Sequence, residues 1–260
     1  MPSNRTIVLA IVLVVAQVTG SPLAAQRAQR DAPVRGYEVV HSYPHDPDAF
    51  TQGLVYRNGV FYESTGRNGH STVRRVEPQT GRVLEQRSVA GEYFAEGLTD
   101  WRDRLIQLTW TSKIGFVYDL ATLRLQTTFA YTGEGWGLTH DDRRLIMSDG
   151  SAALRFLDPE TFKELGRVTV TDAGRPVERL NELEFVNGRV YANVWLTERI
   201  AVVDPGSGRV ESWIDLSGLR GTTASPTDDV LNGIAYDAAT GRIYITGKLW
   251  PDIYEIKFGL

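Results

Sequence analysis

Five short segments of the chain resemble one another and recur at a regular interval. They are Phe50–Leu54, Ala95–Thr99, Gly135–Thr139, Leu180–Leu183 and Leu231–Ile234. Counted between equivalent positions, from Gly53 to Gly233, the successive intervals are about 44, 40, 45 and 51 residues, a period typical of propeller blades or solenoid turns. Because repeats place equivalent residues around one axis, this feature constrains the fold more than any other.

Beyond residue 35 the chain has the pattern of an all-β protein. Short runs rich in Val, Ile, Leu, Tyr and Phe alternate with turns that contain Gly, Asn, Asp and Pro. Each repeat holds four such runs, which in the second repeat are Glu96–Asp100, Arg104–Trp110, Ile114–Asp119 and Leu125–Tyr131. Five such units predict a five-bladed β-propeller with four antiparallel strands in each blade.

The two ends of the chain indicate how the ring of blades closes. The last repeat, from Asn232 to Leu260, has room for only three strands, while Tyr37–Tyr43 is a strand without a repeat of its own. We therefore expect the N-terminal strand to pair with the C-terminal blade. A linear solenoid, the alternative, would need atypical capping repeats, and none is evident in the sequence.

The first 25 residues have the features of an export signal. Arg5 supplies a positive charge, Ile7–Val18 is an apolar run, and Ser21–Ala25 is rich in small residues. The apolar run is short for a membrane-spanning helix, although an uncleaved anchor is the alternative. The sequence predicts a signal peptide at 1–25, a flexible leader at 26–36, a propeller domain at 37–260, and a periplasmic or secreted protein.

Composition excludes several classes of function. The 260 residues carry a formal net charge of -4 at pH 7, whereas nucleic acid and anionic membranes require a clustered positive surface. The chain contains no Cys, which excludes disulfides, thiolate catalysis and cysteine-based zinc sites. Its four histidines show no metal-ligand spacing.

A ring of polar and aromatic side chains is expected at one mouth of the propeller channel. The position before the recurrent glycine should face the axis in each blade, and it is occupied by Gln52, Glu96, Trp136, Asn181 and Asn232. The ends of the second strands should add a second layer at the same mouth, formed by Gly66, Trp110, Gly150, Trp195 and Lys248. Taken singly, each residue is more simply explained by core packing or solvation. Together, apolar walls with a few convergent polar groups predict a small-molecule site.

Eight motifs along the chain occur in an order known from one family. They are Pro44–Asp46 followed by Phe50–Leu54, Glu63–Gly66, Glu96–Thr99, Leu108–Trp110, Trp136–Leu138, Leu180–Leu183, Asn193–Trp195 and Gly247–Lys248. From about residue 37 to the C-terminus, the chain resembles the plant- and bacterial-type glutaminyl cyclases.

The resemblance implies a five-bladed propeller that converts N-terminal glutamine of a peptide to pyroglutamate and releases ammonia. It implies that Glu96 is the catalytic acid/base. It also implies a substrate pocket lined by Phe50, Gln52, Trp110, Trp136, Asn181, Trp195 and Lys248. Catalysis should require no cofactor, although the channel of this family can carry a structural cation.

The chemistry of that reaction suits these residue types. The α-amine of the substrate attacks its own γ-carboxamide carbon, and a general acid–base moves a proton from the amine to the departing nitrogen. Burial among indoles should raise the pKa of Glu96 and make it a better proton donor, while Lys248 would oppose that rise. N–H groups of Gln52, Asn181 or a tryptophan could hold the carboxamide oxygen.

Two other functions are open from the sequence. An exported lactonase-like propeller would use a channel metal and several carboxylates, of which the ring offers Glu96 and, one residue out of position, Glu182. A non-catalytic propeller would bind peptides or partner proteins through its faces. For a cyclase, the expected partners are peptides or proteins with N-terminal glutamine. We expect no nucleic acid, no membrane contact after removal of the signal, and a monomer.

Overall fold

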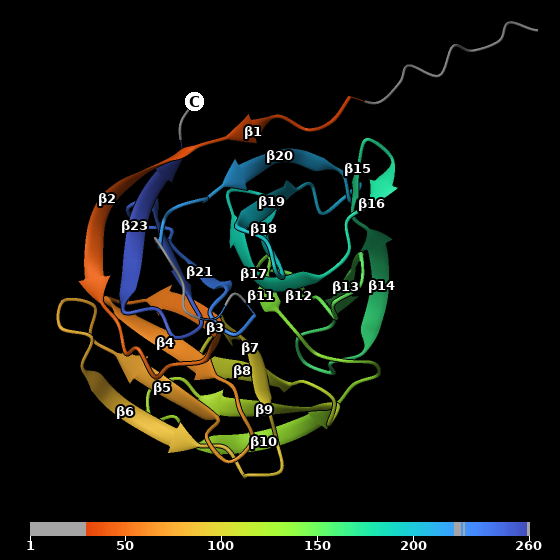
Figure 1. Cartoon of the computed structure of the whole chain (residues 1–260). Helices are drawn as coiled ribbons and strands as arrows, with labels where there is room; N and C mark the ends of the chain where they lie inside the picture. Colours follow the sequence, from red (N-terminus) through yellow and green to blue (C-terminus); the bar gives the residue numbers. More distant parts are fainter. Residues whose placement is uncertain (1–29, 221–224, 226, 259–260) are drawn as a thin grey trace, which may run out of the picture.

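Residues 30–220, 225 and 227–258, which the computed structural model describes, form five four-stranded antiparallel sheets around a central axis (Figure 1). The predicted signal peptide lies outside these residues. Within them, no helix is long and apolar enough to cross a membrane. The five-bladed propeller expected from the repeats is therefore confirmed.

Each blade runs from an inner strand at the axis to an outer strand at the rim. Blade 1 consists of β3 (Thr51–Arg57), β4 (Val60–Thr65), β5 (Thr72–Val76) and β6 (Val83–Ser88). Blade 2 consists of β7 (Ala95–Trp101), β8 (Arg104–Thr109), β9 (Ile114–Asp119) and β10 (Leu125–Ala130). Blade 3 consists of β11 (Leu138–His140), β12 (Leu145–Met147), β13 (Ala153–Leu157) and β14 (Glu164–Thr169). Blade 4 consists of β17 (Leu180–Val186), β18 (Arg189–Val194), β19 (Arg199–Val203) and β20 (Val210–Asp215).

Blade 5 is assembled from both ends of the chain. Its inner strands are β21 (Leu231–Asp237), β22 (Arg242–Gly247) and β23 (Asp252–Phe258), and its outer strand is β2 (Tyr37–Pro44). The antiparallel pairing of β2 with β23 extends from Tyr37 opposite Phe258 to Pro44 opposite Asp252. Figure 1 shows the two strands side by side at the rim. This pairing closes the ring in the predicted way.

The inner strands approach one another closely because of the recurrent glycine. A Cβ atom on Gly53 would lie 2.5 Å from the Leu98 nitrogen of blade 2, and one on Gly97 would lie 2.7 Å from the Gly137 carbonyl carbon of blade 3. Either distance is far below van der Waals contact. Blade 4 instead has Glu182, whose Oε2 accepts a hydrogen bond from Ile234 N at 2.9 Å.

The hydrophobic core consists of apolar layers between successive blades. Between blades 1 and 2, for example, Val55 and Val73 belong to the same buried cluster as Leu98 and Leu105. The inner and middle strands are buried over most of their length, and the outer strands β6, β10 and β14 are largely exposed. Each blade is thus buried on both faces, as propeller packing requires.

The described part of the leader is bound to blade 4. The short strand β1 (Val34–Arg35) pairs in parallel with β20, with Val34 opposite Trp213. Asp172, in the hairpin of β15 (Thr171–Asp172) and β16 (Arg175–Pro176), accepts hydrogen bonds from Ala32 N at 2.8 Å and Trp213 Nε1 at 2.9 Å. Residues 32–35 of the predicted leader thus contact blade 4. A two-residue strand is too short to leave a pattern in the sequence.

A buried ionic cluster lies where the closing strand β2 meets blade 1. Glu63 is its centre: Oε1 accepts a hydrogen bond from Thr51 Oγ1 at 2.6 Å and lies 2.9 Å from His45 Nε2, and Oε2 lies 2.7 Å from Arg74 Nη2. Burial alone would raise the pKa of Glu63, but Arg74 and His45 outweigh it and hold the pKa far below its usual range. His45 Nδ1 also lies 2.6 Å from the Trp250 carbonyl oxygen. Because both ring nitrogens face acceptors, the geometry favours the imidazolium form, in which both nitrogens are donors.

Replacing Glu63 with glutamine should lower the free energy of unfolding by about 3–5 kcal/mol. Arg74 and the His45 imidazolium would stay buried but lose their shared counter-charge. Urea denaturation at pH 7 measures the change. As a control, Glu77→Gln removes a pair with Arg82 on the exposed surface, 3.6 Å apart, and should have no measurable effect. A loss no larger than that of the control would contradict this account of the cluster.

Candidate active site

Glu96 is the buried carboxyl group of the ring. It is the second residue of β7 and is only 6% exposed. Its Oε1 accepts a hydrogen bond from Gln52 Nε2 at 3.0 Å. Burial raises the pKa of Glu96 well above its ordinary value; Lys248 opposes the rise and the negative charge of Glu134 adds to it. A raised pKa makes a carboxyl group a better proton donor than an exposed one.

A relay of side-chain amides orients Glu96. Asn232 Nδ2 donates to Gln52 Oε1 at 3.0 Å and to the Thr51 carbonyl oxygen at 3.0 Å. The Gln52 amide is therefore fixed with its Nε2 toward Glu96. Within the described residues, Glu96 Oε2 takes part in no hydrogen bond. That oxygen is the one available to a substrate.

Aromatic rings from several blades contact one another at the mouth of the channel where the predicted site residues lie. Trp136 and Trp195 meet edge to face with ring centroids 5.7 Å apart. On the other side, Trp110 packs against Phe94 at 5.8 Å, and Phe94 packs against Phe50 at 6.1 Å. Five rings from blades 1 to 4 thus provide the apolar walls that the sequence predicts at this mouth.

Lys248 completes the pocket from blade 5. Its Nζ lies 4.7 Å from the centroid of the Phe50 ring, and the Arg67 guanidinium carbon lies 4.4 Å from the same centroid. Burial lowers the pKa of Lys248, while the charge of Glu96 opposes that shift. A cation at this place disfavours a second positive charge in the pocket.

Asn181 and Asn232 each have a buried side-chain oxygen without a hydrogen-bond partner among the described residues. The side chain of Asn181 is 2% exposed. A buried amide oxygen without a partner costs about 1–3 kcal/mol. Such a group is therefore suited to a ligand that supplies the missing hydrogen bond.

The structure brings the predicted residues to one mouth of the channel but also shows one that sequence reasoning missed. Glu134 Oε2 accepts hydrogen bonds from Trp110 Nε1 at 2.6 Å and from Trp136 Nε1 at 2.9 Å. The only signal was its position two residues before Trp136, in a glycine-rich segment. Its partners could not be read from the repeat, because it lies outside the repeated positions.

The described residues do not assemble side-chain ligands for a metal. No group of three or more His, Cys, Asp and Glu side chains in this part of the chain could hold an ion. Glu182 offers one buried Oε1 without a hydrogen-bond partner among the described residues. Calcium requires about six to eight oxygen ligands, so these side chains do not fit a channel cation.

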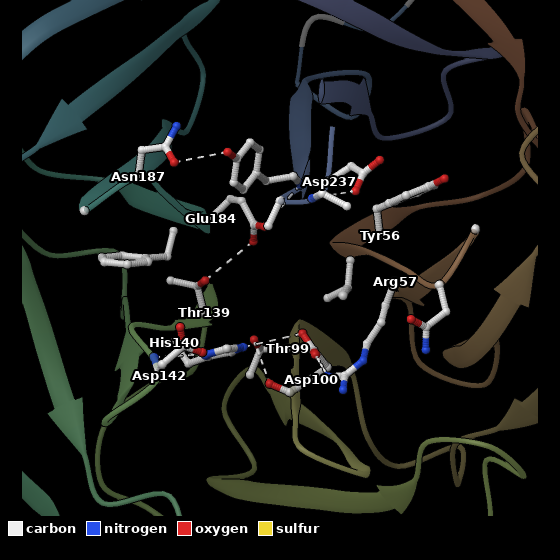
Figure 2. A pocket seen from close by; sticks show the side chains of 18 residues that line it. Tyr56, Arg57, Thr99, Asp100, Thr139, His140, Asp142, Glu184, Asn187 and Asp237 are labelled. Atoms are coloured by element: carbon white, nitrogen blue, oxygen red, sulfur yellow. Dashed lines mark hydrogen bonds and ion pairs between the residues drawn. The ribbon is translucent and has the colours of Figure 1, made fainter. Parts of the chain in front are cut away.

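A second pocket, of about 680 Å³, lies at the other end of the inner strands and contains none of the predicted site residues in its described lining. Figure 2 shows Asp100 in this pocket between Arg57, with which it forms an ion pair, and His140, whose Nε2 is 3.5 Å away. Glu184 in blade 4 accepts hydrogen bonds from both neighbouring blades. The donors are Thr139 Oγ1 of blade 3, at 3.5 Å, and the backbone N of Tyr236 in blade 5, at 3.1 Å. Burial and the nearby charge of Asp100 raise the pKa of Glu184 well above its ordinary value, whereas Asp100 is paired with Arg57.

Comparison with known proteins identifies the family of the chain. The chain matches the glutamine cyclotransferase family over residues 10–258. It is 46% identical over 225 residues to a glutaminyl-peptide cyclotransferase of Arabidopsis thaliana, which covers 85% of this chain and 70% of the relative. The crystal structure of Myxococcus xanthus glutaminyl cyclase superposes with a TM-score of 0.83 at 39% identity, covering 88% of this chain and 98% of that one. The chain therefore belongs to the glutamine cyclotransferase family.

Proposed function

We propose that this protein is a glutaminyl-peptide cyclotransferase in which Glu96 is the general acid and base. It would convert the N-terminal glutamine of a peptide or protein to pyroglutamate and release ammonia. Family membership supports the activity. The observation that carries the role of Glu96 is a buried carboxyl group with a raised pKa and one free oxygen inside an aromatic pocket.

The reaction needs one proton to move between two nitrogens. The α-amine forms a bond to the γ-carboxamide carbon, the bond from that carbon to the amide nitrogen breaks, and ammonia leaves. Glu96 Oε2 accepts the proton that the amine loses and returns it to the departing nitrogen. Both nitrogens belong to one residue, so holding that residue in a folded conformation supplies much of the rate.

The electrostatics of the pocket suit this proton transfer. A free α-amine has a pKa of about 7.7–8.0, so a large fraction is protonated and unreactive at neutral pH. Lys248 disfavours that ammonium form. A general acid–base works best when its pKa lies near the working pH, which is the direction in which burial moves Glu96.

The hydrogen bonds already present narrow the choice of donor for the developing oxyanion. The indole N–H groups of Trp110 and Trp136 donate to Glu134, and Gln52 Nε2 donates to Glu96. Among the described residues, the Asn181 Nδ2 amide group donates no hydrogen bond. We assign this N–H group as the donor to the carboxamide oxygen of the substrate.

Several further properties belong to the same proposal. The protein is exported to the periplasm or secreted, acts as a monomer on peptides or proteins, and requires no cofactor. The apolar N-terminal segment supports the export of the protein. A lactonase-like hydrolase and a peptide-binding propeller are the functions that the following experiments would reveal instead.

Purified protein should release ammonia from Gln-Ala and form the cyclised product, detected by mass spectrometry. Asn-Ala, whose side chain is one methylene shorter, should be inert. Glu96→Gln should lower kcat by about 10²- to 10⁴-fold while circular dichroism shows an intact fold, because the carboxyl group that moves the proton is gone. A variant that keeps most of its activity would refute the role of Glu96.

The same variant should be more stable than the wild type at neutral pH. The raised pKa means that the folded protein binds more protons than the unfolded chain above about pH 4.3, so stability falls as the pH rises toward the folded pKa of Glu96. Each unit of that shift corresponds to about 1.4 kcal/mol. Urea denaturation should show Glu96→Gln gaining stability at pH 8 but not near pH 4. Exposed Glu38→Gln is the control, and a pH-independent difference for Glu96→Gln would contradict this burial effect.

Activity should survive removal of divalent metals. Overnight dialysis against EDTA should leave kcat for Gln-Ala within about twofold, since proton transfer by Glu96 uses side chains alone. A loss restored by added calcium or zinc would favour the metal-dependent hydrolase. Ammonia release with no chelator effect would exclude a channel metal from the chemistry.

A further inference from the structure

Glu134 connects two walls of the pocket. Its Oε2 accepts the indole N–H of Trp110, which follows β8 in blade 2, at 2.6 Å. The same oxygen accepts the indole N–H of Trp136, which precedes β11 in blade 3, at 2.9 Å. In the described structure the two indoles are in ring contact with other residues but not with each other. One carboxylate oxygen therefore fixes their relative position.

The two indoles differ in how well other contacts hold them. Trp136 lies against Trp195 and over Gly150, where a Cβ atom would come within 2.7 Å of the indole. Trp110 is 41% exposed, an unusually high value for a large apolar side chain in a pocket wall, and its one ring contact is with Phe94. Among the described residues, Glu134 is the acceptor of the Trp110 indole N–H, so its removal would leave that group without a protein partner there.

Glu134 also completes a continuous line of side chains around the pocket. The line runs from Trp195 to Trp136, through Glu134 to Trp110, and on through Phe94 toward Phe50. The remaining links in this line are contacts between aromatic rings. Between blades 2 and 3, the link is the charged side chain of Glu134.

We propose that Glu134 is a positioning residue for substrate binding, which holds the two indoles so that they close around the side chain of an N-terminal glutamine. This inference rests on the function proposed above. Hydrogen bonds to an ionised acceptor are shorter and about twice as strong as neutral ones, which suits an anchor at the partly exposed rim. Glu134 orients the groups that touch the substrate and takes no part in proton transfer.

The charge of Glu134 gives the residue a second, separable effect. It raises the pKa of Glu96, against the opposing charge of Lys248. The phenol of Tyr131 is the other titratable group coupled to Glu96. A neutral side chain at position 134 should therefore lower the pKa of Glu96. The part of the kcat/KM profile that depends on this pKa should move to lower pH, whether or not the new side chain still binds the two indole N–H groups.

Two variants separate anchoring from charge. Glu134→Ala removes both the acceptor of the indole N–H groups and the negative charge. We expect KM for Gln-Ala to rise about tenfold, which corresponds to about 1.4 kcal/mol of lost binding free energy, and kcat to stay within about threefold of the wild type. Glu134→Gln keeps an amide oxygen with two lone pairs and can still accept both indole N–H groups. Its KM should return to within about twofold of the wild type, while the pH profile of kcat/KM shifts to lower pH as in Glu134→Ala.

The chain offers a matched control on another part of the surface. Glu160 Oε1 accepts the Trp101 indole N–H at 3.3 Å, and Trp101 is the last residue of β7, at the opposite end from Glu96. Glu160→Ala removes the same type of bond and should leave KM and the pH profile unchanged. The ¹H–¹⁵N indole resonances of the six tryptophans report each bond directly. Glu134→Ala should shift those of Trp110 and Trp136, and Glu160→Ala that of Trp101.

The outcomes distinguish this inference from the proposed function. A wild-type protein that releases no ammonia refutes the function, whereas the indole resonances still test the anchor. A KM unchanged in Glu134→Ala, or raised equally in Glu134→Ala and Glu134→Gln, overturns the positioning role. Wild-type Trp110 and Trp136 resonances in Glu134→Ala would overturn it as well. If Glu134→Ala does not fold, the nearly isosteric Glu134→Gln decides through its KM and its indole resonances.

Discussion

The pairing of β2 with β23 is the contact on which the site depends. It joins the two ends of the chain into one blade, and only a closed ring forces five inner strands to face a common axis. The side chain that precedes the recurrent glycine then lies beside its counterparts from the other blades. Residues as distant in the sequence as Gln52 and Asn232 thereby come within hydrogen-bond distance. The ionic cluster around Glu63 lies at this junction, where closure buries it.

Closure also accounts for the unusual state of Glu96. At the crowded axis, water is largely excluded, so a carboxyl group is driven toward its neutral form unless cations compensate. Lys248 is the compensating charge, but its own burial weakens it. The amide of Gln52 supplies a neutral hydrogen bond instead of a second charge. Burial therefore outweighs the opposing charge of Lys248, and the pKa of Glu96 stays raised.

The repeat predicted the fold and most of the site because both follow from position around an axis. Equivalent residues such as Glu96 and Asn181 could be placed without coordinates, and the closing strand followed from counting strands in the last repeat. Glu134 could not be placed, since its partners Trp110 and Trp136 come from two blades and its own position has no equivalents in the other repeats. The sequence also left the tryptophan N–H groups open as oxyanion donors, because it does not show which acceptor a side chain already binds. In the structure, the N–H groups of Trp110 and Trp136 already donate to Glu134. The short strand β1 likewise depends on a tertiary contact, with Trp213.

The two ends of β7 show why the chemistry belongs to one mouth of the channel. Glu96 and Asp100 lie four residues apart on this strand; the Glu96 carboxyl group is buried and that of Asp100 is partly buried. Burial would raise the pKa of either. At Asp100, hydrogen bonds and charge from His140 and Arg57 outweigh burial and lower the pKa, so this group stays ionised and cannot donate a proton near neutral pH (Figure 2). Glu96 has the neutral amide of Gln52 and the single cation Lys248 as neighbours. Burial therefore remains the largest influence on the pKa of Glu96. The same strand thus carries a fixed negative charge at one end and, at the other, a carboxyl group whose pKa is raised.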